Sequence, residues 1–188
     1  MKNKSQLRQQ MRSITAAASH SEIATASALI CRHLASADEL LEHVKTIAVY
    51  AAHGNELDLT ALHQLLPNRK FLYPLCHKAG RLTYHHVQDP ETLTPGMMGI
   101  LEPYFSQHPE QAVEGIDLFL CPGLAFTREG LRLGQGGGFY DRILSQKNKT
   151  TRVVGICLER QVLDNLPCEP HDMNMDYLLT ERGLQKPY

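Results

Sequence analysis

Apolar side chains recur every three or four positions in the first part of the chain, which is the period of an amphipathic helix. The first stripe lies within residues 4–18 and consists of Leu7, Met11, Ile14 and Ala18. The second follows Ser19, which has capping-box spacing to Glu22, and consists of Ile23, Ala26, Ile30 and Leu34. We expect a third helix over 58–66, ended by Pro67.

Runs of aliphatic, β-branched and aromatic residues predict strands in the rest of the chain. These runs are 46–50, 70–75, 82–87, 116–121, 153–158 and 177–180. A turn is expected at 78–80 and a short helix over 142–144. Because strands alternate with helices, the pattern predicts a single-domain, three-layer α/β/α fold with a parallel or mixed sheet. Residues 88–114, rich in Pro, Gly and acids, are expected to form a loop over a site.

Composition narrows the class of protein without identifying it. With 188 residues, 43% hydrophobic and 21% charged, the chain is typical of one globular domain, residues 1–188. A formal net charge of −1 argues against nucleic acid or an anionic membrane as the main partner. No apolar run approaches the roughly 20 residues that a membrane-spanning helix needs. We therefore expect neither kind of partner.

The cysteines indicate the compartment. They are odd in number and widely spaced, with no CxxC pair: Cys31, Cys76, Cys121, Cys157 and Cys168. This pattern fits neither a disulfide framework nor a zinc site. The sequence therefore predicts a reducing, cytoplasmic location. Residues 1–21 hold several basic residues and no acid, which superficially resembles an organellar transit peptide.

A glycine cluster between a predicted strand and a predicted helix is the most informative feature of the sequence. Five of the thirteen glycines lie between Gly130 and Gly138. Glycine backbone can approach a ligand closely, and successive N–H groups at a helix N-terminus form an anion-binding nest. Arg128 and Arg132 would add charge beside it. The cluster does not match the P-loop motif, which requires Gly-Lys followed by Ser or Thr where this chain has Gly137-Gly138-Phe139. It does not match the dinucleotide motif either, because that motif requires a third glycine at the position of Phe139.

Two interpretations of this loop stay open on the residues alone. One is a flexible loop whose Asp141 merely stabilises a helix start, and the other, which we favour, is a phosphate-binding loop. On spacing alone, the basic face over Lys4, Arg8 and Arg12, at i, i+4 and i+8, is interpreted as a solvated surface. Most histidines are interpreted as surface or structural residues, and Cys121 as a buried apolar side chain.

The segment from Cys121 to Asp141 closely resembles the 5-formyltetrahydrofolate cyclo-ligase (5,10-methenyltetrahydrofolate synthetase) family, whose signature reads PGLAF followed by RxGxRLGxGxGYYD. The resemblance extends to the basic helix at Lys4 and Arg8, the loop 55–58, the segment 99–103 and the C-terminal pattern from Leu166 to Thr180. It covers nearly the whole chain. Phe139 replaces the commoner Tyr, and Gly137 stands where some members carry Lys. Since the match begins at Lys4, it argues against a transit peptide.

This resemblance implies a Rossmann-like fold of the NagB/RpiA/CoA-transferase type and an enzyme that uses ATP and Mg²⁺ to close 5-formyltetrahydrofolate to 5,10-methenyltetrahydrofolate. Arg132 would be catalytic, and Asp141 and Asp172 would bind the metal. The implied ATP contacts are Lys4, Arg8, Arg132, Leu133, Gly134, Gln135, Gly136, Gly137, Gly138, Phe139 and Tyr140. The implied folate contacts are Ala51, Glu56, Gln135, Gly136, Gly137, Gly138 and Phe139, with weaker support for Glu102. The expected state is a monomer.

Other functions were weighed against this one. A non-catalytic homologue that binds folate or nucleotide is the main alternative, although the presence of Arg132, Asp141, Asp172 and Glu56 together counts against it. An RNA-binding relative would need an aromatic-rich RNA motif or a basic excess, and neither is present. A sugar-phosphate isomerase or CoA-transferase of related architecture should turn over without ATP. Without the family resemblance, Asp172 would be interpreted as an exposed loop acid.

Overall fold

The structure is a computed structural model that describes residues 3–96 and 99–187. Its helices are α1 (Lys4–Ala16), α2 (His20–Ala35), α3 (Asp38–Leu41), α4 (Leu62–Leu65) and α5 (Phe139–Leu144), with 3₁₀ turns η1 (Lys78–Gly80), η2 (Pro90–Thr92), η4 (Val113–Gly115) and η5 (Glu159–Gln161). Its strands are β1 (Thr46–Ala48), β2 (Lys70–Cys76), β3 (Leu82–His86), β4 (Thr94–Pro95), β5 (Leu101–Glu102), β6 (Glu110–Gln111), β7 (Leu118–Pro122), β8 (Ala125–Thr127), β9 (Arg132–Leu133), β10 (Arg152–Ile156), β11 (Val162–Leu163), β12 (Tyr177–Thr180) and β13 (Gly183–Gln185).

The first two predicted helices are confirmed, but the third is wrong over most of its length. The Ser19 side chain accepts the Glu22 N–H at 3.2 Å, so it caps α2 with a single bond rather than a reciprocal box. Within 58–66 only Leu62–Leu65 is α-helical. The Asp58 side chain accepts the Thr60 N–H at 2.9 Å, which is a local turn that competes with helix formation.

The central sheet has the strand order β13-β12-β10-β7-β1-β2-β3-β6. Its middle strands, from β12 to β2, are parallel, as the registers Ile47↔Phe71 and Val154↔Leu120 illustrate. At the edges, β13, β3 and β6 pair antiparallel. The predicted mixed sheet is therefore confirmed. Because the middle strands are parallel, their carboxyl ends meet at one edge, where α/β proteins usually bind ligands.

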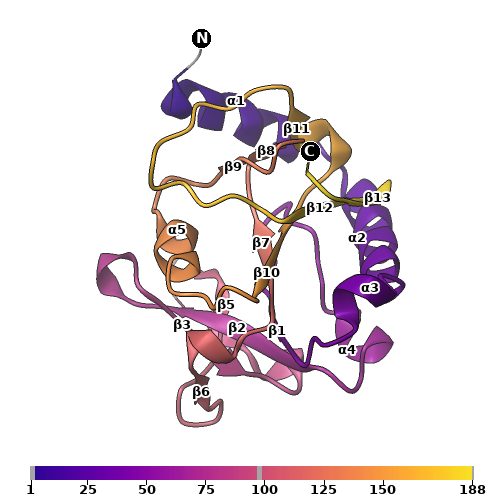
Figure 1. Ribbon diagram of the computed structural model, residues 1–188, viewed down its shortest axis with the longest axis vertical. Coiled ribbons are helices and arrows are strands. Elements are labelled where there is room, and N and C mark those ends of the chain that lie inside the picture. The colour runs from indigo at the N-terminus through magenta and orange to yellow at the C-terminus, as the bar shows by residue number, and fades with distance from the viewer. Residues whose placement is uncertain (1–2, 97–98, 188) are drawn as a thin grey trace.

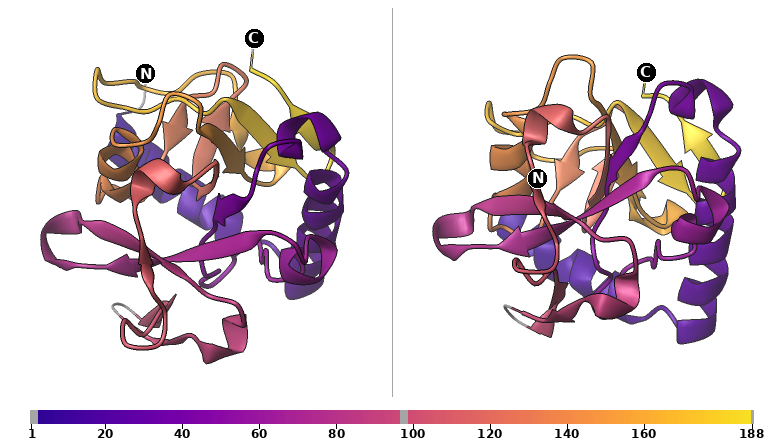
Figure 2. Two further views of the ribbon diagram at one scale, coloured as in Figure 1. Left: turned by 60° about the horizontal axis from the view of Figure 1, so that its bottom comes forward. Right: turned by 90° about the horizontal axis from the view of Figure 1, so that it is seen from below.

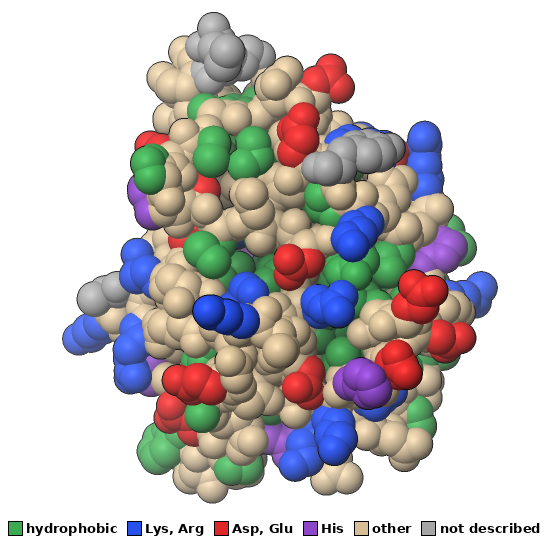
Figure 3. All heavy atoms as spheres, viewed as in Figure 1, with side chains coloured by type: hydrophobic (Ala, Val, Ile, Leu, Met, Phe, Trp, Pro, Cys, Tyr) green, Lys and Arg blue, Asp and Glu red, His purple; other side chains and the backbone are tan. Residues whose placement is uncertain are grey.

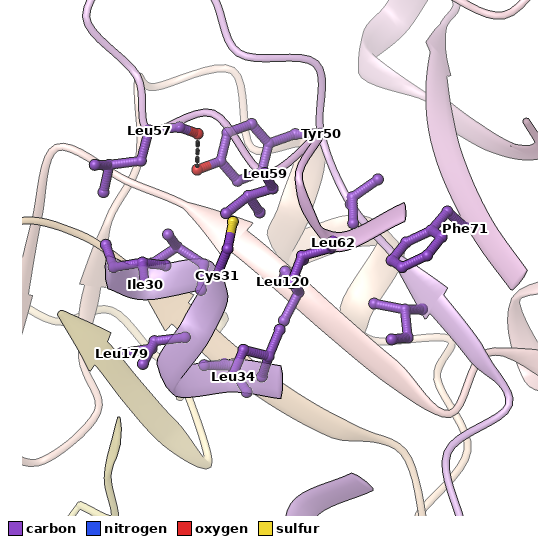
Figure 4. Packing of buried hydrophobic residues seen from close by; sticks show 14 of the residues in the cluster. Ile30, Cys31, Leu34, Tyr50, Leu57, Leu59, Leu62, Phe71, Leu120 and Leu179 are labelled. Atoms are coloured by element: carbon purple, nitrogen blue, oxygen red, sulfur yellow. Dashed lines mark hydrogen bonds between the residues drawn. The ribbon is translucent and has the colours of Figure 1, made fainter. Parts of the chain in front are cut away.

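Helices cover both faces of this sheet, and alternate residues of each strand point to opposite cores. On β7, Leu118 and Leu120 join the core beneath α2, whereas Phe119 and Cys121 join the core beneath α5. Figure 4 shows the first core, in which Ile30, Cys31 and Leu34 of α2 pack near Leu120 and Leu179. Figure 1 shows α2 and α5 on opposite sides of the sheet.

Helix α1 belongs to neither layer. It packs on a separate three-stranded sheet of order β11-β8-β9, which continues from the carboxyl end of β7. The small core between them contains Leu7 and Met11 of α1, with Leu124, Ala125, Leu133 and Leu166. Figures 1 and 2 show α1 beside β8 and β9. The apolar stripe predicted for the first helix is thus buried here, away from the main cores, and an adjacent face of the helix, with Arg8 and Arg12, is turned to the glycine loop.

In its described residues, 88–96 and 99–114, the segment 88–114 contains short elements only. Strands β4 and β5 form a two-stranded ribbon, and β6 extends the edge of the central sheet beside β3. Leu93 and Ile100 anchor the segment to the core beneath α2. Its expected role as a cover over a site stays a prediction.

Acidic and basic side chains are interspersed on the face of the molecule that Figure 3 shows. In the described part of the chain, no helix combines the length and apolarity needed to cross a membrane.

Candidate active site

The glycine loop runs from the end of β9 to the start of α5 and depends on left-handed backbone. Gly138, with φ +64°, is the N-cap of α5, and Gly130, with φ +88°, begins the preceding turn. A Cβ on Gly130 would lie 2.5 Å from the Met175 carbonyl oxygen, a distance that no side chain tolerates. The same glycine accepts the Met175 N–H at 2.8 Å. Glycine is required here because the loop must turn against the backbone of residue 175.

The basic face of α1 lies against this loop. Arg8 donates its Nε–H to the Gly134 carbonyl at 3.0 Å, and Arg12 donates to the side chain and carbonyl of Gln135 at 3.1 and 3.2 Å. At Gly136 an added Cβ would lie 3.4 Å from the Arg8 Cζ. The interpretation of this face as a merely solvated surface is therefore wrong. Two guanidinium groups adjoin the loop that was expected to bind phosphate.

Lys4 joins the C-terminal part of the chain to α1. Its Nζ lies 2.7 and 3.0 Å from the two carboxylate oxygens of Asp172 and 2.9 Å from Glu169 Oε2. Glu169 also donates its backbone N–H to Asp172 at 2.7 Å. Burial alone would raise the pKa of Asp172, but the bonds from Lys4 and from this N–H outweigh burial and lower it. Asp172 is therefore a largely buried anion rather than an exposed loop acid.

Arg132 is buried beneath the loop, with 4% of its side chain exposed. Its guanidinium donates to Asp141 Oδ1 at 3.2 Å and to the Pro122 carbonyl at 3.3 Å, and its Cζ lies 5.2 Å from the centre of the Tyr140 ring. Asp141 Oδ1 also accepts the N–H of Met173 at 3.5 Å. This contact brings Asp141 into the neighbourhood of Asp172, the residue before Met173.

Arg128 does not lie where the sequence interpretation put it. Its guanidinium donates to Glu159 and Gln185 rather than facing the glycine loop. Glu159 in turn accepts the Thr180 hydroxyl at 3.1 Å. Arg128 therefore fastens the loop preceding β9 to the β12–β13 hairpin. Its predicted contribution of charge beside a phosphate is wrong, because an acid distant in sequence holds it elsewhere.

The loop after β1 carries Glu56 and Ala51 toward the same region. The Asn55 amide donates to the carbonyls of Thr15, Ala16 and Ala18 at 3.0, 3.3 and 3.2 Å, so this loop is tied to the end of α1. Glu56 Oε2 accepts the His53 N–H at 3.0 Å, and burial raises the pKa of its carboxyl.

The charge of Glu56 also acts on α5. Burial raises the pKa of Tyr140, and the negative charges of Tyr84, Cys121 and Glu56 add to that rise. Ala51 is 9% exposed and belongs to the core beneath α2. The Asn55 bonds thus hold the loop that carries Glu56 against the end of α1.

Several residues of this region carried no signal in the sequence. Arg142 donates to the Gly80 carbonyl at 2.9 and 3.1 Å and lies over the Phe139 ring, which fastens η1 to α5. Glu169 completes the acidic environment of Lys4. Asn55 caps α1 from a distant loop. Each acts through a partner remote in the chain, so spacing along the sequence could not reveal it.

The interpretations of histidine and cysteine fit the structure. His85 is buried and bonds Thr83 Oγ1 and the His108 carbonyl, each at 2.9 Å. Cys121 is fully buried, and burial raises the pKa of its thiol to about 12. Both are structural.

His171 lies 3.4 Å from Glu169. The side chains of His171, Glu169 and Asp172 present possible metal-ligand atoms within 4.8 Å of one another.

Comparisons with known proteins agree with the resemblance. The model of the 5-formyltetrahydrofolate cyclo-ligase family matches residues 1–181. A 5-formyltetrahydrofolate cyclo-ligase of Mycolicibacterium smegmatis is 40% identical over 96 residues, which are half of each chain. One of Haemophilus influenzae is 34% identical over 137 residues, which are 69% of this chain and 72% of the relative. The structure of Aquifex aeolicus 5,10-methenyltetrahydrofolate synthetase superposes with a TM-score of 0.85 and 30% identity, covering 97% of this chain and 92% of that one.

Proposed function

Because this chain belongs to the 5-formyltetrahydrofolate cyclo-ligase family, we propose that it is an enzyme that converts 5-formyltetrahydrofolate to 5,10-methenyltetrahydrofolate with ATP, releasing ADP and phosphate. The observation that carries this proposal furthest is the convergence on one glycine loop. Guanidinium groups from α1, a buried Arg132 and the carboxylates Asp141 and Asp172 come to it from three separate parts of the chain.

The chemistry explains why such a loop is needed. A formamide carbonyl is a poor electrophile and its oxygen is a poor leaving group. When the formyl oxygen attacks the γ-phosphorus of ATP, ADP leaves and the oxygen becomes a phosphate ester. The neighbouring amine nitrogen of the folate then bonds to the activated carbon, loses its proton to solvent, and the carbon–oxygen bond breaks to release phosphate. Such transfer needs positioning and charge neutralisation rather than a protein nucleophile.

The residues around the glycine loop suit these tasks. The backbone from Leu133 to Tyr140, with Lys4 and Arg8, would hold the phosphates, since helix N-termini and guanidinium groups both favour anions. Arg132 would neutralise charge on the phosphoryl group as it moves. Its bond to Asp141 keeps the guanidinium oriented, and its position beneath the loop excludes water from it.

The carboxylates fit a divalent cation. Carboxylate oxygens are preferred Mg²⁺ ligands, and the Lys4 ammonium bound to both oxygens of Asp172 indicates that a cation is favoured at that place. Asp141 and Asp172 would hold the ion. When bound, Mg²⁺ neutralises phosphate charge and thereby makes transfer easier. Lys4 would then exchange its carboxylate partner for a phosphate.

The folate would lie on the side of Glu56. A carboxylate can accept two hydrogen bonds from the amino-pyrimidine edge of a pterin, and the Glu56 side chain is already oriented by the His53 N–H. Ala51 and the loop residues Gln135 to Phe139 would line the rest of that pocket. In this arrangement the pterin would lie next to Tyr140, with the formyl group between Glu56 and Arg132.

The proposal is tested by mixing the purified protein with 5-formyltetrahydrofolate and Mg²⁺ and following the absorbance of the methenyl product with and without ATP. ATP-dependent product formation is the expected result. Calorimetric binding of both reactants by a folded protein that makes no product would contradict it and favour the non-catalytic alternative.

Two arginines four positions apart, Arg128 and Arg132, provide a matched test of the site. Arg132→Ala should lower kcat about 100-fold or more, because it removes a charge-neutralising group. Arg128→Ala should lower stability by about 1–2 kcal/mol, because it removes the closer of the two cations beside Glu159, but should keep kcat within about twofold of wild type. Turnover and urea unfolding are measured on both variants. Near-normal turnover by Arg132→Ala would refute its role.

Four further properties of the protein are inferred from its sequence. We propose a single domain over residues 1–188, a monomer, and small-molecule substrates without nucleic-acid or membrane partners. We also propose a cytoplasmic location, because all five cysteines are free thiols, as expected in a reducing compartment.

A further inference from the structure

The side chain of Arg142 joins the glycine loop to the central sheet. Its Nε and Nη2 donate to the Gly80 carbonyl at 3.1 and 2.9 Å, and its Nη2 also donates to the Gly137 carbonyl at 2.5 Å. Gly80 ends η1, the turn between β2 and β3, which is held in place by the pairing of these strands and by a 2.9 Å bond from the His77 N–H to the Arg81 carbonyl. Figure 1 shows this turn beside α5, the helix that carries Arg142. One exposed guanidinium therefore fastens the loop to an ordered part of the sheet.

The backbone on both sides leaves room for this guanidinium. Gly80 and Gly138 have φ values of +74° and +64°. A Cβ on Gly80 would lie 1.8 Å from Arg142 Nη2, and one on Gly138 would lie 2.8 Å from Nη1, so a side chain at either position would displace the guanidinium. The guanidinium also lies over the Phe139 ring, 5.7 Å from the ring centre. Contacts on three sides distinguish Arg142 from an arginine that extends freely into solvent.

The bond to Gly137 determines the direction of a neighbouring N–H group. The carbonyl of residue 137 and the N–H of residue 138 belong to one planar trans peptide, in which they point in opposite directions. Residues 136–138 are all glycine, so no side chain restricts this peptide to a single orientation. If the peptide turned over, its carbonyl oxygen would replace the N–H and would repel a phosphate. By holding the Gly137 carbonyl, Arg142 selects one of the two orientations.

We propose that Arg142 is a positioning residue for the phosphates of ATP: it holds the Gly137 carbonyl against the β2–β3 turn, so that the Gly138 N–H stays directed to the bound nucleotide. This proposal rests on the function proposed above, in which the backbone of the glycine loop binds the phosphates. Arg142 acts through two main-chain carbonyls and needs no contact with the nucleotide. The site therefore requires its hydrogen bonds rather than its charge.

The first test compares Arg142→Ala with Arg142→Lys. Because Arg142 and its bonds are exposed, water can replace the guanidinium, and the urea midpoint of Arg142→Ala should stay within about 0.3 M of wild type. Its KM for ATP and its calorimetric Kd for Mg·ATP should both rise about 5- to 20-fold, while kcat and the KM for 5-formyltetrahydrofolate stay within about threefold. A general loss of structure would instead raise both KM values and lower the urea midpoint.

The lysine variant separates hydrogen bonding from charge. Lysine keeps the positive charge but lacks the Nε–H and the planar fork, so Arg142→Lys should show most of the loss of ATP affinity. Full recovery of that affinity in Arg142→Lys would show that charge suffices and would overturn the proposal. An unchanged KM for ATP in Arg142→Ala would overturn it as well.

Gly80→Ala moves the guanidinium without removing it. The added methyl group would occupy the place of Nη2, the atom that bonds both carbonyls. The KM for ATP should rise as in Arg142→Ala, within a factor of about two, and the two changes together should cause no further rise. A rise in the double variant equal to the product of the two single rises would contradict a shared mechanism.

Gly183→Ala is the matched control for backbone strain. Gly183 has a φ of +129° and begins β13 at the other edge of the sheet, and among the described residues no atom beyond its chain neighbours lies within 4 Å of an added Cβ. The substitution should lower the urea midpoint, as Gly80→Ala does, and leave the KM for ATP unchanged. An equal rise in this KM in both variants would assign the loss to strain and would also overturn the proposal.

The same measurements separate this proposal from the proposed function. If wild type binds Mg·ATP but makes no methenyl product, the proposed function fails, and the calorimetric Kd values of wild type, Arg142→Ala and Gly80→Ala still test Arg142. If wild type makes the product and both variants keep its KM for ATP, only the role of Arg142 fails.

Discussion

The side chain of Lys4 shows how one residue can join distant parts of this molecule. It bonds two carboxylates that follow it by 165 and 168 positions. Burial alone would lower the pKa of Lys4, but its bonds to Asp172 and Glu169 outweigh burial and raise it. The pKa of Asp172 is lowered, chiefly by the same Lys4 against the opposing effect of burial. The stability that this ion pair contributes therefore depends on pH, and it is lost both when Asp172 is protonated and when Lys4 is deprotonated.

We predict that Lys4→Met lowers stability at neutral pH by about 1–2 kcal/mol, since the pair is partly buried. A lowered carboxyl pKa contributes stability above about pH 4 that is lost as the pH falls through the folded value. The variant lacks this contribution, so its stability should change less than that of wild type between pH 6 and about pH 3.

Urea unfolding across this range measures the difference between the two profiles. Lys149→Met, which changes an exposed lysine, should stay within about 0.5 kcal/mol of wild type at every pH. Parallel pH profiles for wild type and Lys4→Met would show that the ion pair does not influence stability.

At the scale of elements, α1 is placed by contacts at both of its ends. The Asn3 side chain caps its first turn, and the Asn55 amide bonds three carbonyls at its last turn. Those carbonyls carry the negative end of the helix dipole. Since Asn55 precedes Glu56, this one side chain sets the position of the proposed folate carboxylate relative to the basic face of α1.

We predict that Asn55→Ala costs about 1–2 kcal/mol of stability and that Asn55→Asp costs more at neutral pH. Aspartate would place a negative charge against carbonyl oxygens and the negative end of α1. Below about pH 4 the acid is protonated and can donate again, so Asn55→Asp should recover relative to Asn55→Ala. Thermal unfolding at pH 7 and at acidic pH checks this order, and identical losses at both pH values would contradict it.

The wrong prediction of a helix over 58–66 has a physical cause. Apolar spacing over 58–66 favours a helix, but Asp58 forms a turn with Thr60, and Leu57 and Leu59 are buried in the main core. Periodicity reports which residues are buried and not whether a polar side chain competes with the backbone. In contrast, the strand over 177–180 was predicted to the residue, since β-prone runs in a buried sheet have little alternative.

At the scale of the whole molecule, the candidate site is built from three segments that lie far apart in the sequence. Residues 4–12, 130–141 and 169–173 meet around one loop. The Lys4 ion pairs join the first segment to the third, and hydrogen bonds from Arg8 to Gly134 and from Met173 to Asp141 join each of them to the second. Any ligand that bridges these segments should stabilise the entire fold, because it binds the native arrangement and not the unfolded chain.

We predict that Mg·ADP at about 100 times its Kd raises the unfolding temperature by about 5–10 °C, and that ADP with EDTA raises it less. Hydrogen exchange should slow in α1, in the glycine loop and around residues 169–172 together. Arg8→Met should reduce the temperature shift without a comparable change in the stability of the free protein. Protection confined to the glycine loop alone would contradict a site shared by the three segments.

The α/β class, most strands, the first two helices and the glycine loop can be predicted from the amino-acid sequence, because they depend on local propensity, burial period and backbone freedom at glycine. Which charged side chains meet follows only from the three-dimensional packing. Arg128 and Arg132 lie four positions apart in the sequence, yet one is bound by Glu159 and the other by Asp141. Such partners depend on strand order and register, and these are set by the packing of the whole chain rather than by any short stretch of it.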